Sequence, residues 1–164
     1  DVYKRQVLYL RNTENLKDMI EKLDYAMVPT GFVHCFNGNC KNANRCLRHQ
    51  IIRFIPDTLW AVSVVNPART SPTGKCAAFM ADTPVQYAVG MDHLLDQIPY
   101  LEAKRIKQRL LMTYGKNKFY QFKRKERTFS PEDQQYIRQV FRMYGVKDEP
   151  VFDAWLSGYR WTKG

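Results

Sequence analysis

Residues 35–46 read CFNGNCKNANRC and place Cys35, Cys40 and Cys46 in one short stretch of the chain. The asparagines and the glycine between these cysteines favour turns and left-handed backbone conformations, so the chain is expected to bend sharply here. Cys76, the fourth cysteine of the sequence, follows after 29 intervening residues. Four converging thiolates are chemically suited to a soft divalent ion or to a clustered iron centre. The sequence therefore predicts a metal site formed by Cys35, Cys40, Cys46 and Cys76.

The spacing leaves the nature of this site open. Structural zinc bound by four sulfurs is the first interpretation, and an iron–sulfur cluster is the second. Two disulfide bonds in an exported protein, or reduced cysteines that pack in a core, are the alternatives. His34 and His49 are spare ligands, or else ordinary loop or surface histidines. A site closed by four thiolates has no open coordination position, so it would be structural rather than catalytic, and loss of the metal would unfold this end of the domain.

Around the cysteine segment the pattern predicts one short helix and one strand. Asn42 or Asn44 would cap a helix that passes through Cys46 and ends near Phe54. Residues 58–65 alternate large and small side chains and are rich in β-branched residues, which is typical of a strand.

The second half of the chain is expected to be mainly helical. Helices are predicted at about residues 84–97, 99–114, 131–144 and 151–156, with a strand-like segment at 116–127. Ser130 followed by Pro131 is the clearest helix start, because a capping side chain precedes a proline and two acidic residues. Gly115 and Gly145 would end two of the helices. The fold class that follows is α+β, mainly α, in a single small domain with a few short strands and a cysteine-rich N-terminal loop.

The chain of 164 residues is of the size of one domain, and its composition of 45% hydrophobic and 13% aromatic residues indicates a folded protein. Residues 1–6 look like the translation of an adaptor used in sequencing libraries. Residues 1–18 are therefore expected to be a non-native or read-through leader, and residues 19–164 the domain. The longest apolar run, Leu59 to Val65, is far shorter than the roughly 18 residues of a membrane span.

Positive charge is concentrated in one window. Residues 102–127 carry ten basic and two acidic residues, whereas the whole chain has a net charge of +10. Cations that alternate with aromatic rings suit a polyanion such as nucleic acid, although such cations are also common on a solvated helix face. The candidate nucleic-acid-binding residues are Lys104, Arg105, Lys107, Arg109, Lys116, Lys118, Tyr120, Lys123, Arg124, Lys125 and Arg127.

Nothing in the sequence points to an enzyme. It contains no His-Glu-x-x-His motif, no glycine-rich phosphate loop and no Gly-x-Ser-x-Gly elbow. Glu102 and Glu126 are isolated acidic residues in a segment of mainly basic residues. Asp148, Glu149 and Asp153 cluster beside a proline and are interpreted as first-turn acids of a helix rather than as a catalytic pair.

The chain resembles a family of small uncharacterised proteins, a domain of unknown function abundant in gut bacteria, over about residues 19–161. The resemblance rests on Cys35-x4-Cys40-x5-Cys46-Leu47-Arg48, Gly74-x-Cys76-x-x-Phe79, Leu94-Leu95…Ile98-Pro99-Tyr100, Glu126-Arg127…Ser130-Pro131-x-x-Gln134 and Tyr159-x-Trp161. The family usually has proline directly after the fourth cysteine, where this chain has Ala77. The resemblance implies a start near Met19 and a bacterial, cytoplasmic protein, but no activity.

Three functional hypotheses follow from these observations. The first is a metal-stapled binding module, nucleic-acid-associated or regulatory. The second is a protein-interaction module that binds an acidic protein partner without nucleic acid. The third is an iron–sulfur redox protein.

Overall fold

The computed structural model describes residues 20, 21, 23–70 and 76–161. The expected leader, residues 1–18, lies outside the described residues. The chain forms two compact units. The first unit is Val85–Gly158, and the second contains the described residues up to Pro84 together with Tyr159 to Trp161. The α+β, mainly helical fold class is confirmed, with a three-stranded sheet among the helices of the first unit.

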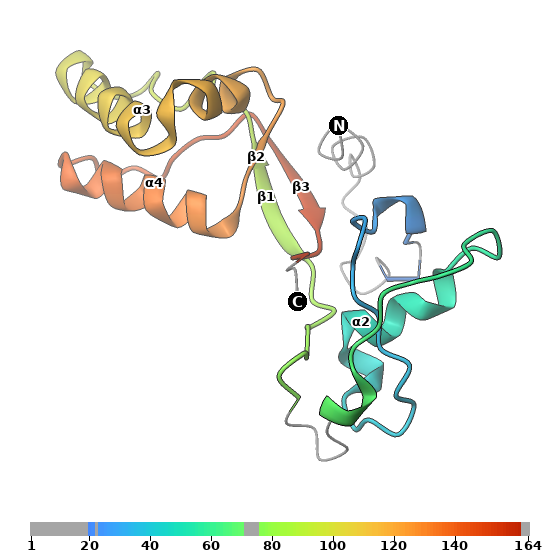
Figure 1. Ribbon diagram of the computed structural model, residues 1–164. Coiled ribbons are helices and arrows are strands. Elements are labelled where there is room, and N and C mark those ends of the chain that lie inside the picture. Colours follow the sequence, from blue (N-terminus) through green and yellow to red (C-terminus); the bar gives the residue numbers. More distant parts are fainter. Residues whose placement is uncertain (1–19, 22, 71–75, 162–164) are drawn as a thin grey trace. The chain divides into compact units, whose positions relative to one another are not determined.

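The sheet of the first unit has the strand order β2-β1-β3 and is antiparallel throughout. Its strands are β1 (Val85–Val89), β2 (Thr128–Phe129) and β3 (Ala154–Gly158). In the register, Ala88 lies opposite Phe129 in β2 and opposite Trp155 in β3. Figure 1 shows β1 between its two neighbours, with α3 and α4 side by side next to the sheet.

Two of the predicted helices are therefore wrong, because β1 and β3 occupy parts of them. The helix predicted at 84–97 was favoured by apolar residues at helical spacing, but Gly90 with φ +73° breaks any helix at its middle. The five residues before it are paired along their whole length with β3. Met91 and Leu94 still reach the core from the turns that follow.

The predicted helix after Pro99 is confirmed, and it forms the first part of α3, which runs from Tyr100 to Lys123. Gly115 interrupts it with φ 73° and ψ 158°, so the first helical segment does end there. The strand-like segment predicted at 116–127 is wrong, because a second helical segment begins directly after the glycine. Phe119 and Phe122, three residues apart on a helix, are both buried, and this contact with the core decides the conformation.

Helix α4 (Pro131–Met143) confirms the predicted start at Ser130. The backbone N–H of Asp133 donates to the Ser130 hydroxyl at 3.2 Å, and the Asp133 carboxylate accepts from the Ser130 N–H at 3.1 Å. This reciprocal capping box satisfies two N–H groups at the start of the helix. Gln134 is buried on the first turn, and its amide donates to the carbonyls of Gln86 and Phe129, which ties α4 to β1 and β2.

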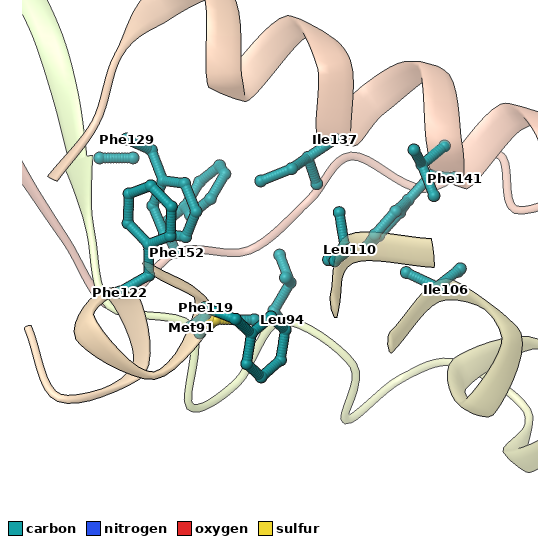
Figure 2. Packing of buried hydrophobic residues seen from close by; sticks show 12 residues of the cluster. Met91, Leu94, Ile106, Leu110, Phe119, Phe122, Phe129, Ile137, Phe141 and Phe152 are labelled. Carbon is teal, nitrogen blue, oxygen red and sulfur yellow. The ribbon is translucent and has the colours of Figure 1, made fainter. Parts of the chain in front are cut away.

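Figure 2 shows the core of the first unit, in which Phe122, Phe129 and Phe152 lie together and Phe141 lies among Ile106, Leu110 and Ile137. The rings of Phe122 and Phe129 stack with centroids 3.9 Å apart, and Phe152 packs on Phe129 at 5.2 Å. Phe152 is buried, and it precedes strand β3 rather than lying in the helix predicted at 151–156.

The second unit is built from short helical turns. They are the 3-10 helices η1 (Tyr25–Met27), η2 (Ala43–Arg45), η3 (Ile51–Phe54) and η4 (Pro67–Arg69) and the α-helix α2 (Leu47–Gln50). The predicted helix through Cys46 to Phe54 is therefore present in pieces. Its predicted cap is wrong, because Asn42 makes no side-chain capping bond and instead accepts hydrogen bonds from the Arg45 guanidinium.

Leu47 and Ile51, one turn apart, are fully buried in the core of the second unit. This core also contains Phe32, Met80 and Tyr159. Because these residues come from distant parts of the sequence, the core holds the segments on either side of the cysteine loop together.

The strand predicted at 58–65 is wrong. Among the described residues, this segment forms only an isolated bridge between His34 and Val64. The alternating pattern does not reflect burial, because the Trp60 side chain is fully exposed and Val64 is half exposed.

Gly90 has closer neighbours than the other glycines of the first unit. A Cβ atom at this position would clash with the Asp153 carboxylate and would stand 2.8 Å from the Lys125 side chain. The Asp153 carboxylate accepts hydrogen bonds from the backbone N–H groups of Asp92 and His93 and forms an ion pair with Lys125 at 3.1 Å. The carboxylate therefore joins the turn after β1, the end of α3 and the start of β3.

We expect Gly90→Ala to destabilise the protein by about 1–3 kcal/mol more than Gly145→Ala, measured by urea denaturation followed by helical circular dichroism. Gly145 is the matched control, because it has φ +79° but no atom within 4 Å of the position that a Cβ would occupy. Both variants force an alanine into the left-handed region, and only Gly90→Ala also displaces Asp153. Equal losses of stability in the two variants would show that the close contact between Gly90 and Asp153 does not affect the free energy of unfolding.

Stability should also depend on the charge of Asp153. Burial by itself raises the pKa of Asp153, but hydrogen bonds from Lys125 and from the backbone of Asp92 and His93 lower it more, so the net pKa lies below its usual value. The carboxylate therefore stabilises the fold above the usual pKa of about 4, and this contribution is lost as the pH falls through the folded-state pKa. Asp153→Asn should cost on the order of 1 kcal/mol at pH 7 and progressively less below about pH 4. Asp148→Asn, at an exposed acid, is the control.

Candidate functional site

The four cysteines line one small cavity of the second unit. Cys35, Cys40 and Cys76 are partly buried, Cys46 is buried, and none of the four is in a disulfide bond. The cavity has a volume of about 20 Å³, which is room for one water molecule or one metal ion. Over residues 20, 21, 23–70 and 76–161, no group of three or more His, Cys, Asp or Glu side chains already stands in coordinating geometry. The fold thus makes the four cysteines neighbours without arranging their sulfurs as a ligand set.

Cys46 is the most firmly held of the four. It is the N-cap of α2, and its carbonyl accepts from the backbone N–H groups of His49 and Gln50 at 2.9 and 2.8 Å. It also forms an antiparallel bridge with Ala81, while Leu47 donates to the Met80 carbonyl. Cys46 is therefore fixed by its own helix and by the segment that follows Cys76.

Arg48 connects the two segments that carry Cys35 and Cys76. Its guanidinium donates to the carbonyl of Val33 at 2.8 Å and to that of Ala78 at 2.9 Å. Each carbonyl belongs to a residue two positions from a cysteine. The Arg48 carbonyl in turn accepts from the Cys35 N–H at 3.0 Å. One residue of α2 therefore positions two cysteine-bearing segments.

His49 lines the same cavity as the cysteines. Its Nδ1 lies 2.9 Å from the carbonyl oxygen of Cys35. Because a carbonyl only accepts, Nδ1 carries the proton, and in the neutral ring Nε2 is left with its lone pair. A backbone carbonyl that fixes the tautomer in this way is the usual companion of a metal-binding histidine.

Cys40 lies in the turn that the Asn- and Gly-rich sequence predicted. The Cys40 N–H donates to the Asn37 carbonyl, and the Asn39 N–H donates to the Asn37 side chain. The Asn42 N–H points at the Cys40 sulfur, 3.4 Å away.

His34, the other spare ligand, is excluded by its contacts. It is buried rather than at the surface, its Nδ1 donates to the Ser63 carbonyl at 3.2 Å, and its Nε2 accepts from the Tyr25 hydroxyl at 2.8 Å. Burial raises the pKa of Tyr25, which keeps the phenol protonated as a donor. Both ring nitrogens of His34 are thus used in holding η1 and the 63–65 segment.

The candidate basic surface divides into exposed and neutralised cations. The exposed cations on α3 are Lys104, Arg105, Lys107, Arg109, Lys116 and Lys123. Arg124 instead pairs with Glu126 at 2.8 Å, and Lys125 pairs with Asp92 and Asp153 at 3.2 and 3.1 Å. These ion pairs raise the pKa of both cations, and hydrogen bonding to the carboxylates is the main cause.

The aromatic residues of this window do not form the stacking surface that the sequence suggested. Phe119 and Phe122 are in the core, and Tyr120 is half-buried with its ring against Phe119. Lys118 lies over the Tyr114 ring at 4.8 Å, and the half-buried Arg127 lies over Phe122 at 5.9 Å. The part of this window that is available to bind a polyanion is therefore the charged face of α3.

The acidic cluster is structural. Glu149 forms an ion pair with Arg138 at 2.7 Å, which ties the 147–150 segment to α4. Asp153 is held by Lys125, as described above. The interpretation of these acids as first-turn residues is wrong, because β3 and not a helix follows them.

Sequence reasoning missed the role of Arg48 and left His49 as a spare. Their position two and three residues after Cys46, on the same short helix, was the available signal. Nothing in the composition indicates that this helix turns its polar side toward the other cysteine-bearing segments.

Residues 19–161 match a family of unknown function (DUF6078). The chain belongs to this family. The match covers most of the chain and agrees in its bounds with the resemblance noted from the sequence. No curated protein and no solved structure matches the chain. Among the described residues, no helix is both long and apolar enough to cross a membrane.

Proposed function

We propose that this member of the DUF6078 family is a small binding module whose second unit is stapled by one structural metal ion. The observation that supports the proposal is the cavity lined by all four cysteines of the chain. A cytoplasmic location, where thiols remain reduced, suits this chemistry.

Zinc is the ion that fits the donor set best. Tetrahedral zinc takes four thiolates at about 2.3 Å, or three thiolates and one imidazole nitrogen at about 2.0–2.1 Å. Cys35, Cys40, Cys46 and Cys76 supply the first set, and His49 is the one imidazole in the cavity wall.

An iron–sulfur cluster is the second candidate for the site. Four cysteine thiolates also hold such a cluster, which absorbs visible light, whereas zinc does not. A mononuclear zinc centre is closed by its four ligands, so its role would be to hold the cysteine segments together.

The binding surface in this proposal is the exposed face of α3. Lys104 and Lys107 lie one turn apart, and Arg105 and Arg109 form a second such pair. A row of cations on a helix neutralises the phosphates of nucleic acid without reading base sequence. An acidic protein partner is the alternative, and it would use the same cations.

Protein purified without added metal should contain one zinc per chain by elemental analysis. Cys76→Ser should lose most of the zinc, and chelation should lower the melting temperature of the wild type. His49→Ala tests the ligand set: the four-thiolate site keeps its zinc, whereas a site of three thiolates and His49 loses it. His93→Ala, at an exposed histidine, is the matched control.

The cobalt-substituted protein gives an independent measurement of the ligands. The sulfur-to-cobalt charge-transfer absorption should match four thiolates in the wild type and fall in Cys76→Ser. Metal-free protein whose four cysteines form two disulfides would contradict the proposal. Brown protein with visible absorption would identify the cluster instead.

Binding to nucleic acid should weaken steeply with added salt. The double variant Lys104→Glu/Lys107→Glu should reduce the slope of log affinity against log salt concentration by about two, since each phosphate contact contributes about one. Lys41→Glu/Lys147→Glu changes the net charge equally at two exposed lysines outside α3 and is the control. Fluorescence anisotropy with a duplex of random sequence measures both.

Equal losses in the two double variants would show that net charge, and not the α3 surface, drives the binding. Absence of binding at low salt would remove nucleic acid as the partner. Recovery of an acidic protein after nuclease treatment, dependent on Lys104 and Lys107, would then support the alternative.

A further inference from the structure

Arg48 is a buried cation in an unusual electrostatic position. Its side chain is only 4% exposed, and in the described part of the chain no carboxylate forms an ion pair with it. Its partners are two neutral carbonyls and the face of the Phe32 ring, 5.2 Å away. A buried charge without a counter-charge is costly, because hydrogen bonds to neutral groups replace only part of its hydration.

The position of Arg48 indicates where a counter-charge would lie. Ala78, whose carbonyl it binds, belongs to the wall of the cysteine cavity. His49, the residue that follows Arg48 in the sequence, also lines the cavity, and Cys46 lies two positions before Arg48. The guanidinium is therefore hydrogen-bonded to the backbone of one residue of the cavity wall, and Arg48 lies on the same short helix as another.

The charge of the centre depends on its ligands. Four thiolates around a divalent ion carry a net charge of −2, whereas three thiolates and a neutral histidine carry −1. Four protonated thiols carry none. A fixed cation bound to the cavity wall thus stabilises the four-thiolate centre most and the metal-free thiols least.

We propose that Arg48 is the counter-charge and the positioning residue of the metal centre, and that it favours a dianionic four-thiolate site. This inference rests on the proposed function. Arg48 acts in two ways: its charge stabilises the anionic centre, and its two donors hold the Val33 and Ala78 carbonyls beside Cys35 and Cys76.

Zinc affinity separates these two effects when it is measured by competition with a chromogenic chelator. Arg48→Met removes charge and donors and should weaken zinc binding about 10- to 100-fold, as is usual for residues that support metal ligands. Arg48→Lys keeps the charge but loses the planar fork, so its loss should be smaller. Arg53→Met is the matched control, because Arg53 is an exposed arginine of the same helical region, in η3.

The reduction potential of the iron-substituted protein is a readout that a purely structural role would not move. One-electron reduction of a four-thiolate iron(III) centre adds one negative charge, which the guanidinium stabilises. Arg48→Met should therefore shift the potential to a more negative value, and Arg48→Lys should leave it near that of the wild type.

The outcomes are distinguishable. Zinc-free wild-type protein would overturn the proposed function and this inference together. Wild-type protein with one zinc, but with unchanged affinity in Arg48→Met, would overturn the inference alone. Weakened zinc binding with an unchanged potential would overturn the electrostatic role, and an equal loss in Arg53→Met would do the same. If Arg48→Met does not fold, the affinity and potential of Arg48→Lys against Arg53→Met still decide between the outcomes.

Discussion

The hydrogen bonds of Arg48 are the contacts on which the cysteine site depends. The helix α2 is only four residues long, and a helix of this length is not stable by itself in water. It is held because Leu47 is fully buried in the core of the second unit, while Arg48 and His49 bind the backbone of other segments. Hydrogen bonds from a charged donor contribute about 1.5–3 kcal/mol each, so each of the two made by Arg48 is comparable with the burial of one large apolar side chain. The short helix is therefore stabilised by the burial of Leu47, and the hydrogen bonds of Arg48 and His49 fix its position relative to the other segments.

The basic surface of the first unit has a similarly local origin. The buried positions of α3, among them Ile106, Leu110 and Phe122, face α4 and the sheet, which leaves the lysines and arginines between them outside. At the end of α3 the chain uses its cations differently, because Lys125 has φ 60° and turns toward Asp92 and Asp153. A window with uniform charge in the sequence thus becomes an exposed row on the helix and a set of ion pairs after it.

Sequence patterns predicted those elements that local chemistry determines. The Ser130 capping box is complete within four residues, and the structure contains it. The strands depend on partners far away in the chain: β1 pairs with β3 some seventy residues later, and no signal within residues 85–97 reports this pairing. The prediction of a strand-like segment at 116–127 failed for a related reason. Aromatic residues in a short segment are compatible with a strand or a helix, and packing against the core determines which of the two forms. For the site, the four cysteines were identifiable from spacing, whereas Arg48 was not, because its carbonyl partners carry no side-chain signature.

The unequal anchoring of the cysteines determines how metal binding and folding would be coupled. Backbone hydrogen bonds hold Cys35 and Cys46 to α2, while Cys40 lies in a turn of asparagines and Cys76 begins a turn closed by the Phe79 N–H. In the proposed metal site, an ion bound to the anchored pair would also have to hold the turns that carry Cys40 and Cys76 in the positions of ligands. Part of its binding free energy would be spent on that ordering, so the affinity would be lower than for four preset thiolates. Contacts that pre-order the Cys35 and Cys76 segments reduce this cost, and the two carbonyls held by Arg48 are contacts of this kind.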